Sequence, residues 1–313
     1  MFSYRETVRG ETPRPTYWTT LLKCLYKYTN VDGLIPNNVL ESFPIYKGDH
    51  GYTEIPQRID NGNSLNICFD GFFQSYKYFH AEYSRIYELL DIDGFKSQIH
   101  FPESLPTIPT ISLHFRVGDY ANIRCYHPVL PILYYERALR HITQTVSLSL
   151  SYDGNPSPDH HRTPTFVPHS GVLPTTDTPQ FRVYVFFEKT DIEYVKNAIQ
   201  QLQQVFPGVV FELVEEKIDW KQMILMSKCD HHIIANSTFS WWGATFSTPH
   251  ILTDAPSSMS SSSKIVCYPS IWYGHQLYYI NTLGLFPDGW TKIVFRESEM
   301  DKSYCKCFSN HPR

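Results

Sequence analysis

Apolar residues follow two different patterns along the chain, and the change falls near residue 109. After that point, short runs of apolar and β-branched residues alternate with stretches in which apolar residues recur at helical spacing. The runs predict strands and the stretches between them predict helices. We expect strands at 111–115, 181–187, 209–214 and 232–235, and helices at 131–142, 195–205 and 219–226. Strands that alternate with helices are typical of a parallel sheet, so the predicted fold class is α/β.

The starts of these helices carry sequence signals of their own. Pro131 suits the first turn of a helix, because backbone N–H groups there have no acceptor within the helix and proline has no N–H. Thr190 and Glu193 have the spacing of a capping box, and Asp219 with Gln222 repeats that spacing before the next helix. The helices are therefore expected to begin close to these residues.

The pattern is weaker in the first part of the chain. Residues 1–20 are polar and rich in proline, and the segment 71–79 is strongly aromatic. Apolar spacing predicts short helices at 21–28 and 81–90, with the second one stopped near Gly94.

Two stretches do not fit the alternation and are expected to be surface insertions. Residues 147–180 are rich in Ser, Pro, Thr and His, and 257–263 are almost all serine. The whole chain has 313 residues, which at roughly 150 residues per domain suggests about two domains. We place the boundary between 1–109 and 110–313.

Composition narrows the class of protein. Charged residues make up 19% of the chain and hydrophobic residues 42%, which excludes intrinsic disorder. The net charge of −4 argues against a protein that follows the phosphates of a nucleic acid. Apolar runs are too short to span a membrane, and the N-terminus lacks the apolar stretch of a signal peptide.

The seven cysteines are scattered and odd in number, unlike a disulfide framework. Cys305 and Cys307 lie close together, but no second pair or suitably spaced histidines complete a zinc site. We therefore expect reduced thiols in a cytosol-like compartment.

A His-x-Arg-x-Gly-Asp-Tyr sequence begins at His114 and ends the first predicted strand of the α/β region. Ligands of parallel α/β sheets gather at the carboxyl ends of the strands. Strand alternation directs His114 and Arg116 to the same face, and Gly118 lets the backbone turn close to a ligand. A guanidinium in this position suits a phosphate or carboxylate clamp. The alternative is an ion pair between Arg116 and Asp119 that only holds the loop.

The last predicted strand leads into Asn-Ser-Thr-Phe-Ser-Trp-Trp-Gly, residues 236–243. Backbone N–H groups at a helix start, together with the hydroxyls of Ser237, Thr238 and Ser240, suit a diphosphate. The aromatic residues of this run either pack a base or belong to the core. Asn236 also begins an N-glycosylation sequon, which is accidental if these atoms line a site.

Together these two motifs resemble the α-1,2-fucosyltransferase family, whose members are inverting enzymes that use GDP-fucose. Weaker matches follow in the family's order and extend the resemblance over essentially the whole chain outside the two insertions. They lie at residues 14–18, 71–79, 134–139, 219–231 and 285–290.

The resemblance implies a GT-B-like architecture in which two Rossmann-like domains face a cleft. Residues 1–109 would form the acceptor-side domain, and 110–313 the donor-binding α/β domain with the two insertions. The family opens with a strand and a Gly-Gly-Leu-Gly-Asn-Gln-like loop that reaches the reaction centre. This sequence begins downstream of that loop, so the N-terminal domain is expected to be incomplete.

Two further departures concern single positions. Many members of the family have Arg where this chain has Val117. Members often show Ser-Asp-Asp after the strand expected at 181–187, whereas here Lys189 and Thr190 precede a single aspartate, Asp191.

The resemblance also implies roles for the site residues. Arg116 would clamp the β-phosphate of the donor and His114 would support donor binding. Asp119 would orient Arg116 or act as a base. Asp219 is a candidate for binding guanine, with helix capping as the alternative. The remaining donor-binding candidates are Asn236, Ser237, Thr238, Phe239 and Ser240.

The function expected from the resemblance is transfer of L-fucose from GDP-fucose to a galactoside hydroxyl, in α-1,2 linkage and with inversion. The alternatives are an N-terminally truncated, inactive homologue that binds only nucleotide or glycan, and a transferase that uses another nucleotide sugar. The expected partners are GDP-fucose and a galactoside-containing glycan. The expected location is the cytoplasm, with the Golgi lumen or membrane as the alternative for a chain that has lost an N-terminal anchor.

No cofactor or metal is expected. Asp91-Ile-Asp93 matches the metal-binding Asp-x-Asp motif only by letter, because it falls at the end of a predicted helix. Arg116 would then supply the electrostatic stabilisation that a divalent ion gives in other enzymes.

Overall fold

The computed structural model describes seven ranges of the chain. They are residues 17–28, 35–48, 52–55, 67–102, 107–152, 180–252 and 264–300. Residues 153–179 and 257–263, which make up most of the two predicted insertions, lie outside these ranges, as do Cys305, Cys307 and Arg14.

A sheet of six parallel strands forms the centre of the fold, with the order β5-β4-β3-β6-β7-β8. Each strand predicted after residue 109 is present, with ends that differ by a residue or two. The parallel sheet confirms the predicted α/β class. The strands are β3 (Thr110–His114), β4 (Phe181–Phe186), β5 (Val209–Leu213), β6 (His231–Ile233), β7 (Val266–Pro269) and β8 (Thr291–Ile293).

The strand order reverses between β3 and β6. From β3 the chain adds β4 and then β5 on one side, and it returns to place β6 on the other side of β3. The chain therefore passes from β3 and from β6 to opposite faces of the sheet, an arrangement in which ligands bind at the carboxyl edge.

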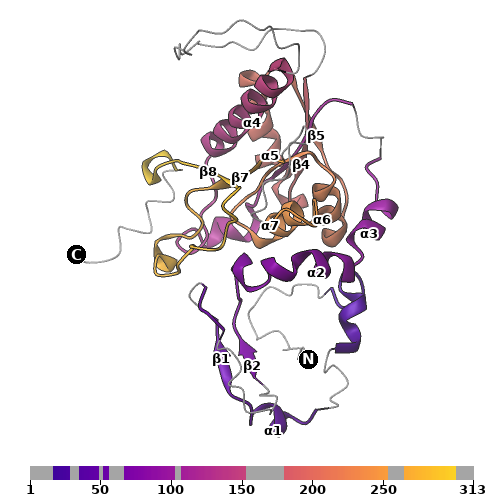
Figure 1. Ribbon diagram of the computed structural model, residues 1–313. Helices are drawn as coiled ribbons and strands as arrows, with labels where there is room; N and C mark the ends of the chain where they lie inside the picture. The colour runs from indigo at the N-terminus through magenta and orange to yellow at the C-terminus, as the bar shows by residue number, and fades with distance from the viewer. Residues whose placement is uncertain are drawn as a thin grey trace, which may run out of the picture.

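Helices cover both faces of this sheet (Figure 1). One face carries α4 (Ile132–Tyr152) and α5 (Ile192–Val205), and the other carries α6 (Asp219–Ser227) and α7 (Thr238–Thr245). Alternation along β3 divides its side chains between the two faces. Ile111 and Leu113 are packed in the cluster with α4 and α5, whereas Ser112 and His114 point the other way.

Helix α4 runs to Tyr152, well beyond the end predicted at residue 142. The apolar stripe continues through the buried Val146. The hydroxyls of Thr143 and Ser149 donate hydrogen bonds to helix carbonyls one turn back, at 2.9 and 2.8 Å. Such bonds satisfy polar side chains within a helix, so a segment that reads as a polar insertion begins as helix.

The first part of the chain contains short elements. They are 3₁₀ helix η1 (Lys23–Tyr28), α1 (Asn37–Leu40), β1 (Ile45–Lys47), β2 (Cys68–Asp70), η2 (Tyr76–Tyr78), η3 (His80–Glu82), α2 (Tyr83–Leu89) and α3 (Ile92–Gln98). Strands β1 and β2 form a separate parallel pair beyond α2 (Figure 1). The later 3₁₀ helices are η4 (Gly118–Asn122), η5 (Lys189–Asp191), η6 (His275–Leu277) and η7 (Glu297–Glu299).

The helix stop predicted near Gly94 is wrong. Gly94 lies inside α3, and the break between α2 and α3 falls at Asp91, whose φ of 55° is left-handed. A Cβ on Gly94 would collide with the Asp91 carboxylate. The glycine therefore makes room for the side chain at the helix junction instead of ending the helix.

Helices α2 and α3 share a core with the sheet. Tyr83, Tyr87, Ile92 and Phe95 belong to the same buried cluster as side chains of α6 and α7. Tyr83 is fully buried, and its hydroxyl donates a 2.6 Å hydrogen bond to the carbonyl of Thr245 at the end of α7. Residues on both sides of position 109 are thus packed in one continuous cluster.

The expectation of reduced thiols is wrong at one position, because Cys125 is disulfide-bonded. Cys24, Cys68, Cys229 and Cys267 are free. The scattered spacing of the cysteines gives no indication of a bond, since two residues that are distant in sequence can meet only through the fold.

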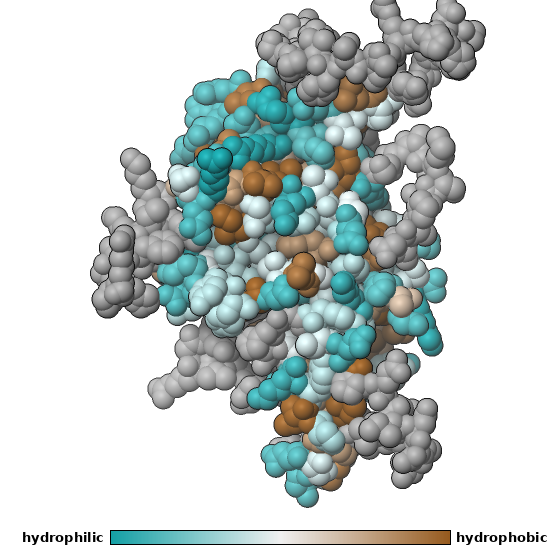
Figure 2. All heavy atoms as spheres, turned by 60° about the vertical axis from the view of Figure 1, so that its left-hand side comes forward, coloured by the Kyte–Doolittle hydropathy of each residue, from teal (hydrophilic) through white to brown (hydrophobic). Residues whose placement is uncertain are grey.

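Within the described ranges, no helix combines the length and the apolar character needed to cross a bilayer. On the face shown in Figure 2, apolar side chains form small separate groups among polar ones. Exposed apolar residues of the molecule include Ile45, Phe69 and Phe72 near β1 and β2.

Candidate active site

A cavity of about 950 Å³ opens at the carboxyl ends of β3, β4 and β5. Its polar lining comes from the ends of these strands and the loops that follow them. It includes His114 at the end of β3, Arg116 and Asp119 in the loop after β3, Glu188 and Lys189 after β4, and Glu215, Glu216, Lys217 and Asp219 after β5. His114 and Arg116 therefore share one face, as strand alternation predicts. We call this cavity the carboxyl-edge pocket.

Arg116 is the centre of a tight polar cluster in this pocket. Its Nη2 donates to Asp119 at 2.7 Å, and its Nη1 donates to the carboxylate of Glu188. The guanidinium carbon lies 5.1 Å from the centre of the Tyr120 ring, within cation–π range. The Arg116 side chain is only 11% exposed. Its Nε is buried and has no hydrogen-bond partner among the described residues.

His114 is buried beside this guanidinium. Burial, and to a lesser degree the Arg116 charge, lowers the pKa of His114 to about 3, so the imidazole is neutral at physiological pH. Its Nδ1 has no partner within the described part of the chain. The ring centre lies 5.5 Å from that of Phe239, which also lines the pocket. A neutral imidazole can donate one hydrogen bond and accept another without adding charge.

The loop after β4 fixes the loop after β3. The carboxylate of Asp191 accepts a hydrogen bond from the Gly118 N–H at 2.9 Å. Asp191 is also the N-cap residue of α5, but its side chain makes no capping bond. The capping box predicted for Thr190 and Glu193 is therefore wrong in its contacts, although the helix begins where it indicated.

The residues of the Asn-Ser-Thr-Phe-Ser run are placed in different ways. Phe239 lines the pocket, and Thr238 is exposed at the start of α7. Ser237 is buried as the N-cap of α7, where its Oγ accepts from the Phe239 N–H at 3.4 Å. The buried Ser240 hydroxyl accepts from the Ala235 N–H at 3.1 Å. The two serine side chains are thus used to build the turn between β6 and α7.

Asn236 joins three loops. Its Nδ2 donates to the carbonyls of Pro128 and Trp272, at 2.9 and 3.2 Å, and the residue is 1% exposed. Its own carbonyl accepts from the Tyr120 hydroxyl at 3.1 Å, which ties the loop after β6 to the loop after β3. A side-chain amide that is buried and bonded in this way is not accessible for glycosylation, so the sequon match is accidental.

Asp219 lies at the side of the pocket opposite β3. It is the first residue of α6, whose N-cap is Ile218. The Asp219 carboxylate accepts from the Trp220 N–H at 2.7 Å and from the Tyr17 hydroxyl at 2.9 Å. Gln222 bonds to the carbonyl of Glu216 instead of reaching back to the cap, so the capping pair predicted for Asp219 and Gln222 is wrong. Tyr17 brings the first part of the chain to the pocket.

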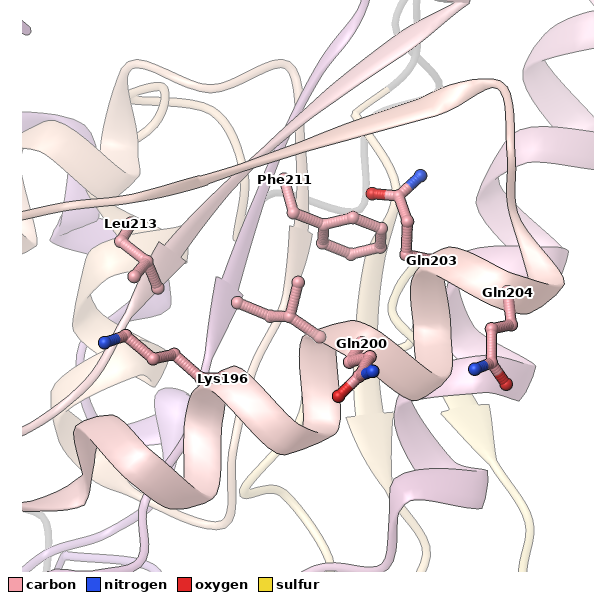
Figure 3. Close-up of a pocket in the computed structure, with 7 residues that line it drawn as sticks. Lys196, Gln200, Gln203, Gln204, Phe211 and Leu213 are labelled. Atoms are coloured by element: carbon pink, nitrogen blue, oxygen red, sulfur yellow. The ribbon is translucent and has the colours of Figure 1, made fainter.

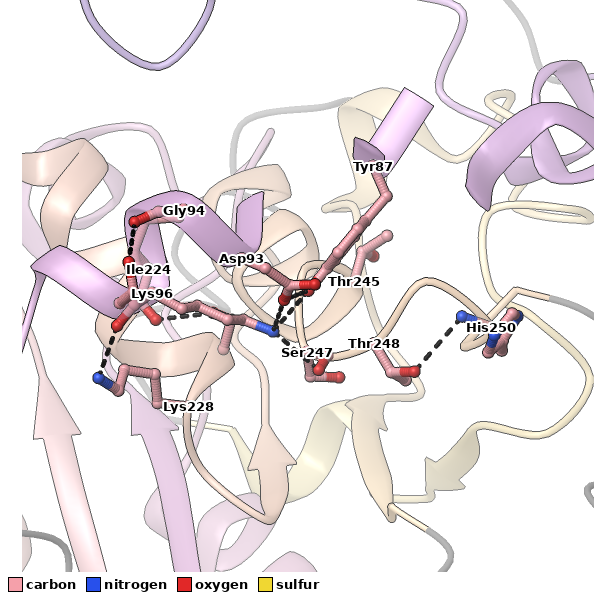
Figure 4. A network of polar contacts seen from close by, with 12 residues as sticks. Tyr87, Asp93, Gly94, Lys96, Ile224, Lys228, Thr245, Ser247, Thr248 and His250 are labelled. Carbon is pink, nitrogen blue, oxygen red and sulfur yellow. Dashed lines mark hydrogen bonds and ion pairs between the residues drawn. The ribbon is translucent and has the colours of Figure 1, made fainter. Parts of the chain in front are cut away.

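Asp91 and Asp93 lie at the start of α3, outside the lining of the pocket. The Asp93 carboxylate accepts from the Tyr87 hydroxyl at 2.6 Å and pairs with Lys96 at 3.9 Å, as Figure 4 shows. Lys96 also donates to the Ser247 carbonyl at 2.9 Å, and burial lowers its pKa to about 8. These contacts connect α2 and α3 to the loop after α7. The described residues contain no cluster of potential metal ligands.

A second cavity of about 460 Å³ lies at the outer edge of the sheet, between α5 and β5 (Figure 3). It is lined by apolar side chains such as Phe211 and Leu213, with glutamines and Lys196 around them. None of the sequence-predicted site residues lies there, and it offers no pair of groups for acid–base or nucleophilic chemistry.

Sequence reasoning missed Glu188, Asp191 and Tyr17 as residues of the site region. Glu188 could have been found, because it follows a predicted parallel strand and such strand ends meet at one edge of the sheet. For Asp191 the sequence indicates only a departure from the family pattern. The position of Tyr17 depends on a contact between residues 202 positions apart, which no local pattern indicates.

The fold and the pocket define an α/β protein with a polar cluster centred on Arg116 at the carboxyl edge of a parallel sheet. The model of the family described as "Glycosyl transferase family 11" matches residues 179–265. The resemblance to a family of glycosyltransferases that the motifs predict is thereby confirmed.

Two curated relatives from Escherichia coli are similar to parts of this chain. An "O-antigen biosynthesis glycosyltransferase WbnK" is 28% identical over 187 residues, which cover 59% of this chain and 44% of the relative. An "Alpha-1,2-colitosyltransferase" is 23% identical over 244 residues, which cover 76% of this chain and 66% of the relative. The matches therefore span less than two thirds of the relatives' own lengths. No solved structure matches the chain.

Proposed function

We propose that this glycosyltransferase transfers L-fucose from GDP-fucose to a hydroxyl of a galactoside, with inversion and in α-1,2 linkage. The observation that carries the proposal is the meeting of Arg116, His114 and Asp219 in one pocket with Phe239. These residues come from three separate motifs, and together they offer a cation, a neutral hydrogen-bonding ring and a carboxylate around one ligand-sized space.

The proposed donor lies across the pocket from Arg116 to Asp219. Cleavage of a sugar–phosphate bond places negative charge on the leaving diphosphate, and Arg116 is the cation positioned to stabilise it. His114, being neutral, binds without repelling the guanidinium. At the far side, the Asp219 carboxylate can accept the two N–H donors of a guanine edge. Tyr17, which donates to this carboxylate, would hold it in place.

The helix start at 237–240 has a supporting role in this proposal. The backbone N–H groups there would face the diphosphate, while the buried Ser237 and Ser240 keep the turn in shape. Asp119 pairs with Arg116 at 2.7 Å, so its proposed role is to orient the clamp. A GT-B-like arrangement, with the acceptor bound on the side of the first 109 residues, belongs to the same proposal.

A second donor has a specific observation in its favour. One of the relatives is named as an alpha-1,2-colitosyltransferase, so a nucleotide-linked colitose is the competing substrate. The third possibility is a chain that binds nucleotide or glycan without transferring sugar.

The test is a donor panel with the purified protein. GDP-fucose, a colitose nucleotide and UDP-galactose are each incubated with lactose, and the products are analysed by mass spectrometry and by NMR of the anomeric proton. A new α-1,2-fucosyl product from GDP-fucose supports the proposal. Transfer of colitose alone replaces the donor, and GDP binding without any product supports the inactive homologue.

The proposal includes independence from divalent metals, because Arg116 supplies the positive charge. Transfer is expected to continue at an unchanged rate in excess EDTA. A loss of activity that Mn²⁺ restores would overturn this part of the proposal and leave the donor assignment intact.

A further inference from the structure

The guanidinium of Arg116 is paired with two carboxylates, one more than its charge requires. Asp119 lies three residues away on the same loop and contacts Nη2. Glu188 comes from the loop after β4 and contacts Nη1. Both Nη atoms of the guanidinium therefore contact a carboxylate, and an anion that is to bind Arg116 must compete with one of the two.

Glu188 occupies a specific place beside the backbone. A Cβ on Gly118 would collide with Oε2 of Glu188, so the absence of a side chain there makes room for the carboxylate. The same carboxylate reaches Arg116 through its other oxygen. The Glu188 carboxylate, which lines the pocket, thus lies between the guanidinium of Arg116 and the backbone of Gly118.

Of the two carboxylates, that of Glu188 can move away from Arg116 more readily. Its side chain is 44% exposed, compared with 31% for Asp119. Glu188 belongs to the lining of the pocket, and solvent can take up its charge when it turns outward. Asp119 moves with Arg116 because the two share a loop, so its exchange would require the loop itself to rearrange.

We propose that Glu188 is an internal counter-ion of Arg116. Its carboxylate contacts the guanidinium where the phosphates of the donor would bind, and the phosphates displace it. The inference rests on the proposed function for the identity of that donor. The carboxylate keeps the arginine neutralised while the pocket is empty. A ligand displaces it only by offering more than one negative charge to the site, so Glu188 makes the pocket selective for diphosphates over singly charged anions.

The experiment measures the affinity for inorganic pyrophosphate by isothermal titration calorimetry in the full chain. Glu188→Gln keeps the shape of the side chain and removes its charge, so pyrophosphate binding is expected to tighten about fivefold or more. Glu188→Ala is the second variant and should change the affinity in the same direction. The matched control is Glu212→Gln, which removes a carboxylate paired with Arg182 at 3.0 Å outside the pocket lining.

Guanosine and GDP separate this role from a general effect on the pocket. Glu188→Gln should tighten GDP and leave the uncharged guanosine unchanged, because only the phosphates compete with the carboxylate. Equal or weaker pyrophosphate binding by both Glu188 variants would overturn the proposal, and so would a change of the same size in guanosine affinity or with Glu212→Gln.

The same titrations, extended to UDP and ADP for the wild-type protein, distinguish this inference from the proposed donor. If the wild-type protein does not prefer GDP to other nucleotides but Glu188→Gln still tightens pyrophosphate, the donor assignment fails and the counter-ion role stands. If GDP is preferred and pyrophosphate affinity does not rise in either variant, the donor assignment stands and the counter-ion role is overturned.

Discussion

The Asp191 carboxylate lies 2.9 Å from the backbone nitrogen of Gly118 and accepts its hydrogen bond. The bond joins the loop after β4 to the loop after β3, and it is made by a residue that is only 8% exposed. Arg116 lies two residues before Gly118, so the position of the guanidinium depends on a neighbouring strand as well as on its own.

Replacing Asp191 is therefore expected to affect both stability and ligand binding. Asp191→Ala leaves the Gly118 N–H without its partner, at a cost of about 1–3 kcal/mol in the free energy of unfolding. Asp191→Asn retains an oxygen that can accept the bond and should lose less. Urea denaturation and GDP titration of both variants provide the measurement. Equal losses in the two variants would mean that the charge of Asp191 matters and the bond does not.

Removal of the Arg116 guanidinium should abolish most of the transfer activity. We expect Arg116→Ala to reduce kcat by a factor on the order of 10²–10³ or more, as for the loss of a donor that stabilises transition-state charge. Arg116→Lys keeps the charge but not the forked geometry, and it should fall between Ala and wild type. The measurement is the initial rate of product formation at saturating donor. Near wild-type turnover by Arg116→Ala would remove this residue from the mechanism.

Asn236 is expected to act mainly on the fold. Asn236→Ala leaves the carbonyls of Pro128 and Trp272 without their shared donor, which should lower the free energy of unfolding by about 1–3 kcal/mol. Asn236→Asp should be worse, since it places a carboxylate oxygen against a carbonyl in a buried position. Chemical denaturation tests both changes. Weaker GDP binding with unchanged stability in Asn236→Ala would instead favour a direct contact with the donor.

Stability should decline as the pH falls below neutrality. Burial lowers the pKa of His114 to about 3 and that of His231 to about 4, both from 6.5, and it lowers the pKa of His232 well below 6.5. Below pH 6.5 these histidines take up protons in the unfolded chain but not in the folded one. Their stabilising contribution is therefore complete above pH 6.5 and is lost as the pH falls from there towards 4, at about 1.4 kcal/mol per pH unit for each.

The urea concentration at the midpoint of unfolding, measured at pH 7, 6 and 5, tests this dependence of stability on pH. His232→Asn should reduce its slope, because one of the titrating groups is gone. The control is Ser112→Ala, which removes the hydroxyl that lies 2.8 Å from Nδ1 of His232 and keeps the histidine. This control should lower stability at every pH and leave the slope nearly unchanged. An unchanged slope in His232→Asn would show that this histidine does not contribute to the dependence.

The strands of the large sheet could be predicted from the sequence because they are short buried runs of apolar residues with clear boundaries. The end of α4 could not, since serine and threonine read as loop residues until their hydroxyls are seen to bond back to helix carbonyls. Gly94 also predicts a helix end that the structure does not have. The glycine is needed because the Asp91 carboxylate lies where its Cβ would be, and the sequence pattern does not show this contact.

The candidate site was predictable where one strand end carried the whole motif. His114 and Arg116 share a pocket, as alternation along an extended strand end predicts, although β3 itself ends at His114. The second carboxylate on Arg116 was not predicted, because Glu188 reaches the arginine from another strand, 72 residues away in sequence. The disulfide bond of Cys125 escaped prediction for the same reason, since such a bond depends on which distant segments the fold brings together.

The buried hydroxyl of Tyr83 donates to the carbonyl of Thr245 in the last turn of α7, and the first turn of α7 contains Phe239, which lines the pocket. Chimeras that join the first 109 residues of one relative to the remainder of another would replace one side of this packed interface without the other. Such crossovers are expected to give insoluble protein even where both parent proteins are expressed in soluble form. Recombination between relatives should therefore exchange α2 and α3 together with α6 and α7, and place its crossovers elsewhere.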